Sequence, residues 1–175
     1  THQDLEDRRR FLNARHTLST LIDFGIIPII NENDTVAVDE IRVGDNDTLA
    51  SEVAHLADAD LLVILSDVDG LYTEDPRRNP SATLIPFIPA ITDDIERLAG
   101  MSSTFEGTGG MATKLRAAKK VGQYGVSTLI LNGERAALLA SALTTGTGGS
   151  LLLARERRLN SRKHWIAFTL RPRGQ

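Results

Sequence analysis

The stretch LLVILSDVDG, residues 61–70, decides the fold of this chain. Its first five residues are all large and apolar, and a short continuous run of this kind is typical of a strand that is buried on both faces of a parallel sheet. The polar turn of residues 66–70 follows this run directly. We therefore predict a buried strand over residues 61–65 whose carboxyl end opens into a polar turn.

Further strands and helices alternate on both sides of this stretch. Apolar runs predict strands over residues 26–30, 84–88, 127–131 and 151–153, and a small hairpin over residues 36–38 and 41–43. Apolar residues at helical spacing predict helices over residues 4–24, 48–57, 92–98, 111–124 and 135–143. Strands that alternate with helices predict an α/β fold, a three-layer sandwich in which helices cover both faces of a mainly parallel sheet.

Composition excludes several classes of protein. The 175 residues are 41% hydrophobic and 25% charged, which is ordinary for a globular chain and excludes disorder and collagen-like structure. The chain has no cysteine, which excludes disulfide scaffolds, thiol nucleophiles and cysteine-ligated metal sites. No apolar run approaches the roughly 20 residues of a membrane span. We therefore expect a soluble, cytoplasmic protein without membrane contacts.

Charge is distributed unevenly along the chain. The formal net charge is -3, yet residues 154–175 carry seven Lys or Arg against one Glu. The acidic remainder argues against general nucleic-acid binding, because that affinity comes mostly from neutralised phosphates. This acidic charge does not argue against a single phosphorylated ligand that is held by backbone amides and one lysine.

Polar clusters follow the predicted strands at three places, residues 31–34, 44–47 and 66–67. Ligands of open α/β sheets bind outside the carboxyl ends of the strands, so these clusters are candidate binding residues. The alternative is that Asn and Asp simply form turns and caps there. Asp47 in particular is either the N-cap of the helix from Thr48 or a group that organises charges during phosphate transfer.

The segment GTGGMATK, residues 107–114, precedes a predicted helix and favours a polyphosphate ligand. Glycines allow close backbone approach, the helix start offers free N–H donors, and Lys114 adds a full charge in the first turn. The spacing fits neither a Walker A loop nor the dinucleotide fingerprint, so an ordinary connection into a helix remains the alternative. The four histidines show no ligand spacing, and we predict no metal site built from them.

Taken together, these strings resemble the amino-acid kinase family. The strings are INEND at residues 30–34, VGDND at 43–47, LSD at 65–67, GLYT at 70–73 followed by Asp75 and Pro76, and GTGGMATK at 107–114. The resemblance covers nearly the whole chain. The string from Asp67 through Pro76 is shared by several members of the family, whereas the first two strings favour the branch that acts on glutamate.

The resemblance implies ATP-dependent phosphorylation of the γ-carboxylate of L-glutamate with Mg²⁺, the first step of proline biosynthesis. By the same resemblance, Asp34 and Asn46 hold glutamate, Asp47 orients the catalytic lysines, and Lys114 is the cation of the transition state. Ser66 and Asp67 line the nucleotide site. The residues that embrace the phosphates are Thr108, Gly109, Gly110, Met111, Ala112, Thr113 and Lys114.

The resemblance also sets expectations for organisation and partners. Family members begin with a strand and a lysine-containing phosphate loop that would lie upstream of Thr1, so residues 1–153 are expected to be the C-terminal portion of an incomplete kinase domain. Residues 154–175 resemble a basic linker and the start of a PUA domain, through which alone RNA binding is expected. A homo-oligomer and feedback inhibition by proline are implied as well. We expect the chain by itself to be inactive or nearly so.

Two other functions remain open. The chain could belong to a uridylate kinase or an aspartokinase, which would show as competition by UMP or L-aspartate. It could also be a non-catalytic module that binds a nucleotide, an effector or, through its basic tail, RNA.

Overall fold

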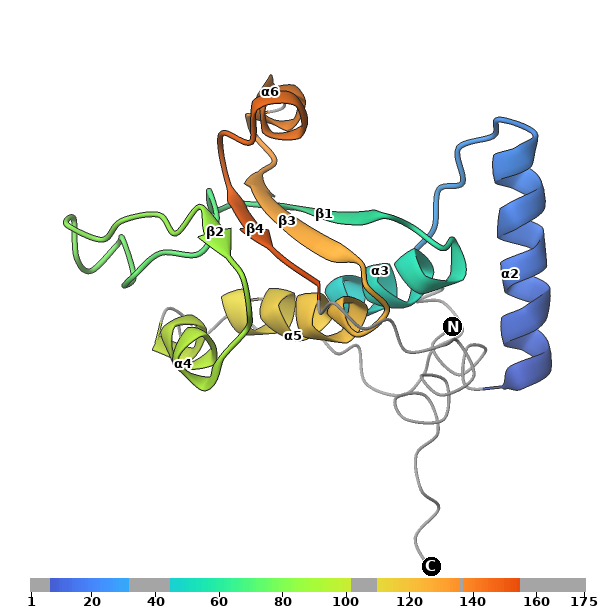
Figure 1. The fold of residues 1–175 in the computed structure, drawn as a ribbon, viewed down its shortest axis with the longest axis horizontal. Helices are drawn as coiled ribbons and strands as arrows, with labels where there is room; N and C mark the ends of the chain where they lie inside the picture. The colour runs from blue at the N-terminus through green and yellow to red at the C-terminus, as the bar shows by residue number, and fades with distance from the viewer. Residues whose placement is uncertain (1–6, 32–44, 102–109, 136, 155–175) are drawn as a thin grey trace, which may run out of the picture.

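The computed structural model describes residues 7–31, 45–101, 110–135 and 137–154. Within them lies a four-stranded sheet in the order β1-β3-β4-β2 (Figure 1). The strands are β1 (Leu61–Ser66), β2 (Phe87–Ile88), β3 (Ser127–Asn132) and β4 (Ser150–Leu152). β1 pairs with β3 and β2 pairs with β4 in parallel, whereas β3 and β4 are antiparallel. The predicted α/β class with a mainly parallel sheet is confirmed.

Five helices are described, and most of them lie on one side of the sheet. They are α2 (Arg8–Asp23), α3 (Asp45–Leu56), α4 (Asp93–Met101), α5 (Met111–Gly122) and α6 (Ala137–Thr145). Figure 1 shows α3, α4 and α5 below the strands and α6 on the opposite side, while α2 stands at the margin of the molecule, where it contacts α3. None of these helices has the length and apolar character needed to cross a membrane.

The core lies between the sheet and α5. Ile64 of β1 is paired with Ile130 of β3 in parallel register, so both side chains point to the same face. There they pack with Leu115 and Val121, two residues of the apolar stripe predicted for α5. The buried residues of α5 recur at helical spacing because only one face of this helix meets the sheet.

Two ion pairs fix α3 against α5. Asp47 pairs with Lys114 near the first turn of each helix, and Glu52 pairs with Lys120 at 2.8 Å further along. Because the second pair lies C-terminal to the first on both helices, α3 and α5 run in the same direction and begin at the same end of the layer. This arrangement brings the two helix starts together.

A smaller cluster joins α2 to α3. Phe11 and Leu18 of α2 pack against Leu49 and Leu56 of α3. His55 lies at the edge of this cluster, with its ring stacked on Tyr124 at a centroid distance of 3.6 Å. Burial, followed by the charge of Arg15, lowers the pKa of His55 from 6.5 to about 4.

Most predicted elements are present with shifted ends. α3 begins three residues before the predicted start at Thr48, so Asp47 lies inside the first turn of the helix and is not its N-cap. The weak strand predicted over residues 84–88 is reduced to β2 and a single bridge between Tyr72 and Leu84. The predicted hairpin lies outside the described residues.

One predicted strand is wrong. Residues 26–30 form no strand, and Ile26, Ile27, Ile29 and Ile30 are all exposed. Pro28 has no N–H to donate to a ladder, which disfavours this segment as the middle of a central strand. The prediction of this strand rested on its apolar composition alone, which is not sufficient to identify a strand.

Candidate active site

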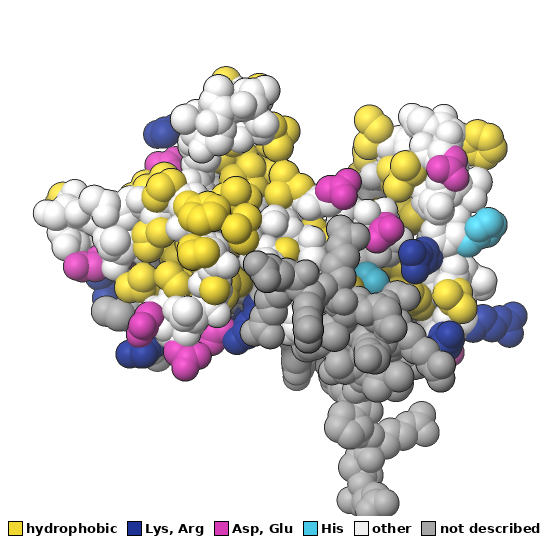
Figure 2. All heavy atoms as spheres, in the orientation of Figure 1, with side chains coloured by type: hydrophobic (Ala, Val, Ile, Leu, Met, Phe, Trp, Pro, Cys, Tyr) yellow, Lys and Arg dark blue, Asp and Glu magenta, His cyan; other side chains and the backbone are white. Residues whose placement is uncertain are grey.

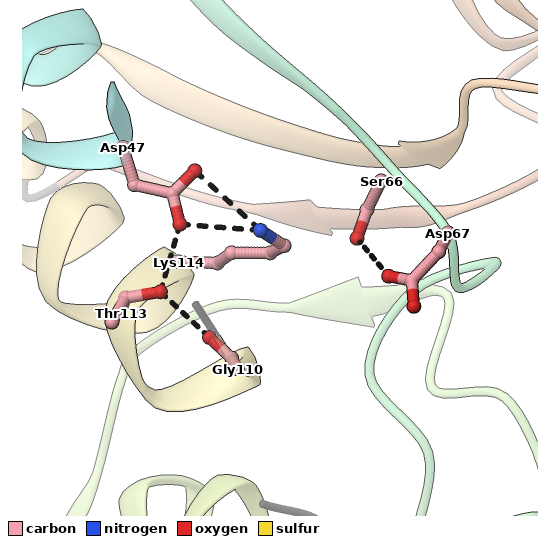
Figure 3. Close-up of polar contacts among 6 residues, drawn as sticks. All are labelled: Asp47, Ser66, Asp67, Gly110, Thr113 and Lys114. Carbon is pink, nitrogen blue, oxygen red and sulfur yellow. Dashed lines mark hydrogen bonds and ion pairs between the residues drawn. The ribbon is translucent and has the colours of Figure 1, made fainter. Parts of the chain in front are cut away.

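The starts of α3 and α5 meet around a single carboxylate, that of Asp47 (Figure 3). The Nζ of Lys114 lies 3.2 Å from Oδ2 and 3.5 Å from Oδ1 of Asp47. The hydroxyl of Thr113 lies 2.8 Å from the same Oδ2. Asp47 was predicted to orient the catalytic lysines and Lys114 to be the cation of the transition state. The structure brings these two residues together, although 67 positions separate them in the sequence.

The pair is shielded from water. The side chains of Lys114 and Asp47 are 11% and 15% exposed. An ion pair in such a place interacts more strongly than one at the surface, because the effective dielectric constant is lower. The ammonium group of Lys114 is thus held in one place by the carboxylate of Asp47.

The start of α5 adds hydrogen-bond donors next to this pair. Gly110 is the N-cap, and as a glycine it has no side chain that could cap the helix. The N–H of Thr113 bonds to the carbonyl oxygen of Gly110 at 3.0 Å. The N–H groups of an uncapped first turn, together with the positive end of the helix dipole, favour an anionic ligand. A phosphate group is one anion that suits a lysine beside a helix start.

Ser66 and Asp67 form a second polar group, at the carboxyl end of β1. The hydroxyl of Ser66 donates to Oδ1 of Asp67 at 3.0 Å. Figure 3 draws no interaction that joins this pair to Lys114 or Asp47. Asp67 is exposed and is therefore accessible to a ligand outside the strand end.

The other predicted site residues differ in their positions. Asn46 is exposed in the first turn of α3. Met111 is buried in the core and Ala112 is half-buried, so a ligand could meet the backbone of Met111 but not its side chain. Asp34, Thr108 and Gly109 lie outside the described residues.

A hydrogen-bonded group around Asp69, which follows β1, was not predicted from the sequence. Asp69 accepts hydrogen bonds from the hydroxyl of Tyr72 at 3.0 Å and from the amide of Asn132 at 3.0 Å, and Arg135 lies 3.4 Å away. Burial, followed by this bond to Asp69, raises the pKa of Tyr72. Asn132 ends β3, so the rule that directed attention to the carboxyl ends of the other strands could have found it. The group ties the loop after β1 to the end of β3.

Comparisons with known proteins identify the family of this chain. The Amino acid kinase family matches residues 1–132. A glutamate 5-kinase of Geobacter metallireducens and one of Geobacter sulfurreducens are each 59% identical to this chain over 175 residues, which is 100% of the chain and 47% of each relative. The chain thus spans about half the length of the curated relatives that it matches.

Solved structures resemble the fold. The UMP kinase of Bacillus anthracis has a TM-score of 0.57 at 19% identity, over 83% of this chain and 52% of that protein. An isopentenyl phosphate kinase in its substrate complex has a TM-score of 0.55 at 24% identity, over 78% of this chain and 52% of that protein. At these identities the likeness concerns the fold alone.

Proposed function

This chain belongs to the amino acid kinase family, and we propose that it carries the nucleotide-facing part of an enzyme that phosphorylates the γ-carboxylate of L-glutamate with ATP. The observation that carries this proposal is the shielded pair of Lys114 and Asp47 at the joined starts of α3 and α5. The substrate is inferred from the relatives named glutamate 5-kinase, which share 59% of the aligned residues.

The reaction requires positioning and charge neutralisation more than proton transfer. A carboxylate oxygen of glutamate attacks the γ-phosphorus of ATP, the bond from that phosphorus to the β,γ-bridging oxygen breaks, and ADP leaves with the electron pair. No general base is needed, because a glutamate side chain with a pKa of about 4.3 is already ionised at neutral pH. The main obstacle is the approach of one anion to another, so fixed cations and N–H donors supply most of the catalysis.

The resemblance to the family assigns the roles of the site residues, and this chemistry accounts for the role of Lys114. Lys114 neutralises charge on the transferred phosphoryl group, and Asp47 keeps its ammonium in place. The start of α5, with Gly110, Met111 and Ala112 after Thr108 and Gly109, accommodates the phosphates, and Ser66 and Asp67 line the nucleotide site. Thr113 belongs to the same helix start, and its hydroxyl lies 2.8 Å from Oδ2 of Asp47. Asp34 and Asn46 hold the glutamate.

Mg²⁺ would arrive with the nucleotide. Among the residues that the structure describes, no three His, Asp or Glu side chains gather into a metal-binding group. The carboxylate of Asp47 is engaged by Lys114 and Thr113, which does not fit the role of a metal ligand. Mg²⁺ commonly keeps several waters and binds through the phosphates of a substrate, so a protein cage is not required.

The resemblance extends the proposal to partners and organisation. Residues 1–153 would belong to the kinase domain of a cytoplasmic protein that assembles as a homo-oligomer and is inhibited by proline. Residues 154–175 would lead into a PUA domain, and only that domain would bind RNA.

The test is an assay of a hybrid protein in which this chain replaces the matching region of the Geobacter metallireducens relative. Acyl phosphate is trapped with hydroxylamine, and ADP release is measured with L-glutamate, L-aspartate or UMP as the acceptor. We expect glutamate-dependent ADP and hydroxamate from the hybrid, and little or none from the 175 residues alone. ADP release that depends on aspartate or UMP instead would assign a different kinase, and no product with any acceptor would leave a nucleotide-binding module.

A further inference from the structure

The hydroxyl of Thr113 lies between two acceptors at the start of α5. Its oxygen is 2.8 Å from Oδ2 of Asp47 and 2.7 Å from the carbonyl oxygen of Gly110. A threonine hydroxyl has a single proton to donate. The charged carboxylate is the stronger acceptor, and the Gly110 carbonyl already receives the N–H of Thr113 at 3.0 Å. We therefore assign the hydrogen bond of the Thr113 hydroxyl to the carboxylate of Asp47.

Both donors of Thr113 are thus used inside the protein. The N–H bonds to Gly110, and the hydroxyl bonds to Asp47. Phosphate oxygens are hydrogen-bond acceptors, so a residue without a spare donor offers a phosphate little. Thr113 differs in this respect from Lys114, whose ammonium has three donors and is in contact with one carboxylate.

Thr113 and Lys114 are consecutive residues of α5, and they contact the same oxygen of a carboxylate on α3. Without the hydroxyl, the short side chain of Asp47 could turn about its bonds, and the ammonium that depends on it would lose its fixed place. From this geometry we infer that Thr113 is a positioning residue, which fixes the carboxylate of Asp47 and through it the ammonium of Lys114. This inference rests on the proposed phosphoryl transfer.

The first measurement compares Thr113→Val with Thr113→Ser in the hybrid protein. Valine keeps the shape of threonine but removes the hydroxyl, whereas serine keeps the hydroxyl. We expect Thr113→Val to lower kcat about tenfold, since a small misplacement of a catalytic group is costly, with KM for MgATP within about twofold. Thr113→Ser should recover most of kcat. An increased KM for MgATP at unchanged kcat would overturn the inference in favour of direct phosphate contact, and so would a serine variant as slow as the valine variant.

The second measurement does not depend on turnover, so it separates this inference from the proposed function. The hybrid protein is labelled with limiting acetic anhydride, and mass spectrometry compares acetylation of Lys114 with that of Lys119, which is paired with Glu96 on the surface. Thr113→Val and Asp47→Asn should each raise the Lys114 to Lys119 ratio severalfold, and the double variant should raise it no further than Asp47→Asn alone. An unchanged ratio in Thr113→Val would overturn the inference even in a hybrid that makes no product. If the valine variant unfolds, Thr113→Ala serves in the same comparison.

Discussion

Two apolar stretches of this chain, residues 26–30 and β3 (Ser127–Asn132), look alike in sequence and differ completely in the structure. β3 pairs with β1 on one side and with β4 on the other, and its Ile130 is fully buried. Residues 26–30 pair with nothing among the described strands, and Ile29 is 98% exposed. Figure 2 shows scattered hydrophobic side chains at the surface beside α2, and a larger group of them at the surface on the sheet side of the molecule. A strand is therefore decided by its hydrogen-bonding neighbours as well as by its composition.

The largest effect should come from truncating the same residue type in each stretch. Ile130→Ala should lower the free energy of unfolding by about 2–5 kcal/mol, because it opens a cavity beneath α5. Ile29→Ala should change it by less than about 0.5 kcal/mol, because the side chain touches little. Urea unfolding measures both variants. Equal losses would mean that residues 26–30 are packed in solution and that the comparison fails.

Two glycines, Gly25 before residues 26–30 and Gly149 against β3, should give a smaller difference in the free energy of unfolding when each is replaced by alanine. Gly149 precedes β4 with φ +79°, and a Cβ there would lie 2.3 Å from the carbonyl oxygen of Ile130. Gly25 precedes Ile26 with φ +70°, and a Cβ there would meet nothing within 4 Å. Gly25→Ala should cost about 1–2 kcal/mol from backbone strain alone, and Gly149→Ala should cost about 1–3 kcal/mol more from overpacking. Thermal unfolding compares the two, and a Gly25 variant as unstable as the Gly149 variant would contradict this account.

The smallest effect concerns the α2 side of the molecule and appears only in acid. The ring of His55 lies between Phe11 of α2 and Tyr124, which follows α5. Burial lowers the pKa of His55 from its ordinary value of 6.5 to about 4, so the ring is neutral at pH 7. Arg15 and Lys120 lower this pKa further and Asp58 opposes them, while Glu52 on the same helix pairs with Lys120. Between these two pH values the unfolded state binds more protons, so stability is present above pH 6.5 and falls as the pH drops toward 4.

The variant His55→Gln isolates this contribution. Urea midpoints are measured at pH 7.5 and pH 5 for both proteins. We expect the variant to lose less stability than the parent between the two pH values, although it is less stable at pH 7.5 because the stacking on Tyr124 is lost. Parallel losses would show that His55 does not titrate as the structure indicates.

Much of the packed part of the molecule, the sheet and α5, could be predicted from the sequence, because the sequence patterns that indicate these elements are local. The apolar run of β1 and the stripe of α5 each follow from a spacing that one helix or strand imposes. Residues 26–30 have the same composition, and Pro28 was the signal that should have corrected the interpretation. The start of α3 was placed too late because Asp45 and Asn46 also suit a turn.

Residues of the proposed site could be named from the sequence, but their contacts could not. Lys114 stood out because it follows glycines at a helix start, and Asp47 stood out among the polar residues near strand ends. The bond from Thr113 to Asp47 joins residues that are 66 positions apart, so no local pattern could reveal it. The bond depends on α3 and α5 running in the same direction, which only their packing determines.

The most direct test of the proposed site compares two lysines of the same helix in the hybrid protein. Lys114→Ala should lower kcat for glutamate-dependent ADP release by about 100-fold or more, because it removes the cation expected in the transition state, while nucleotide affinity changes far less. Lys119→Ala, which removes a surface lysine paired with Glu96, should leave kcat within about twofold. A Lys114→Ala variant with unchanged kcat would remove Lys114 from the mechanism and contradict the assignment of this site.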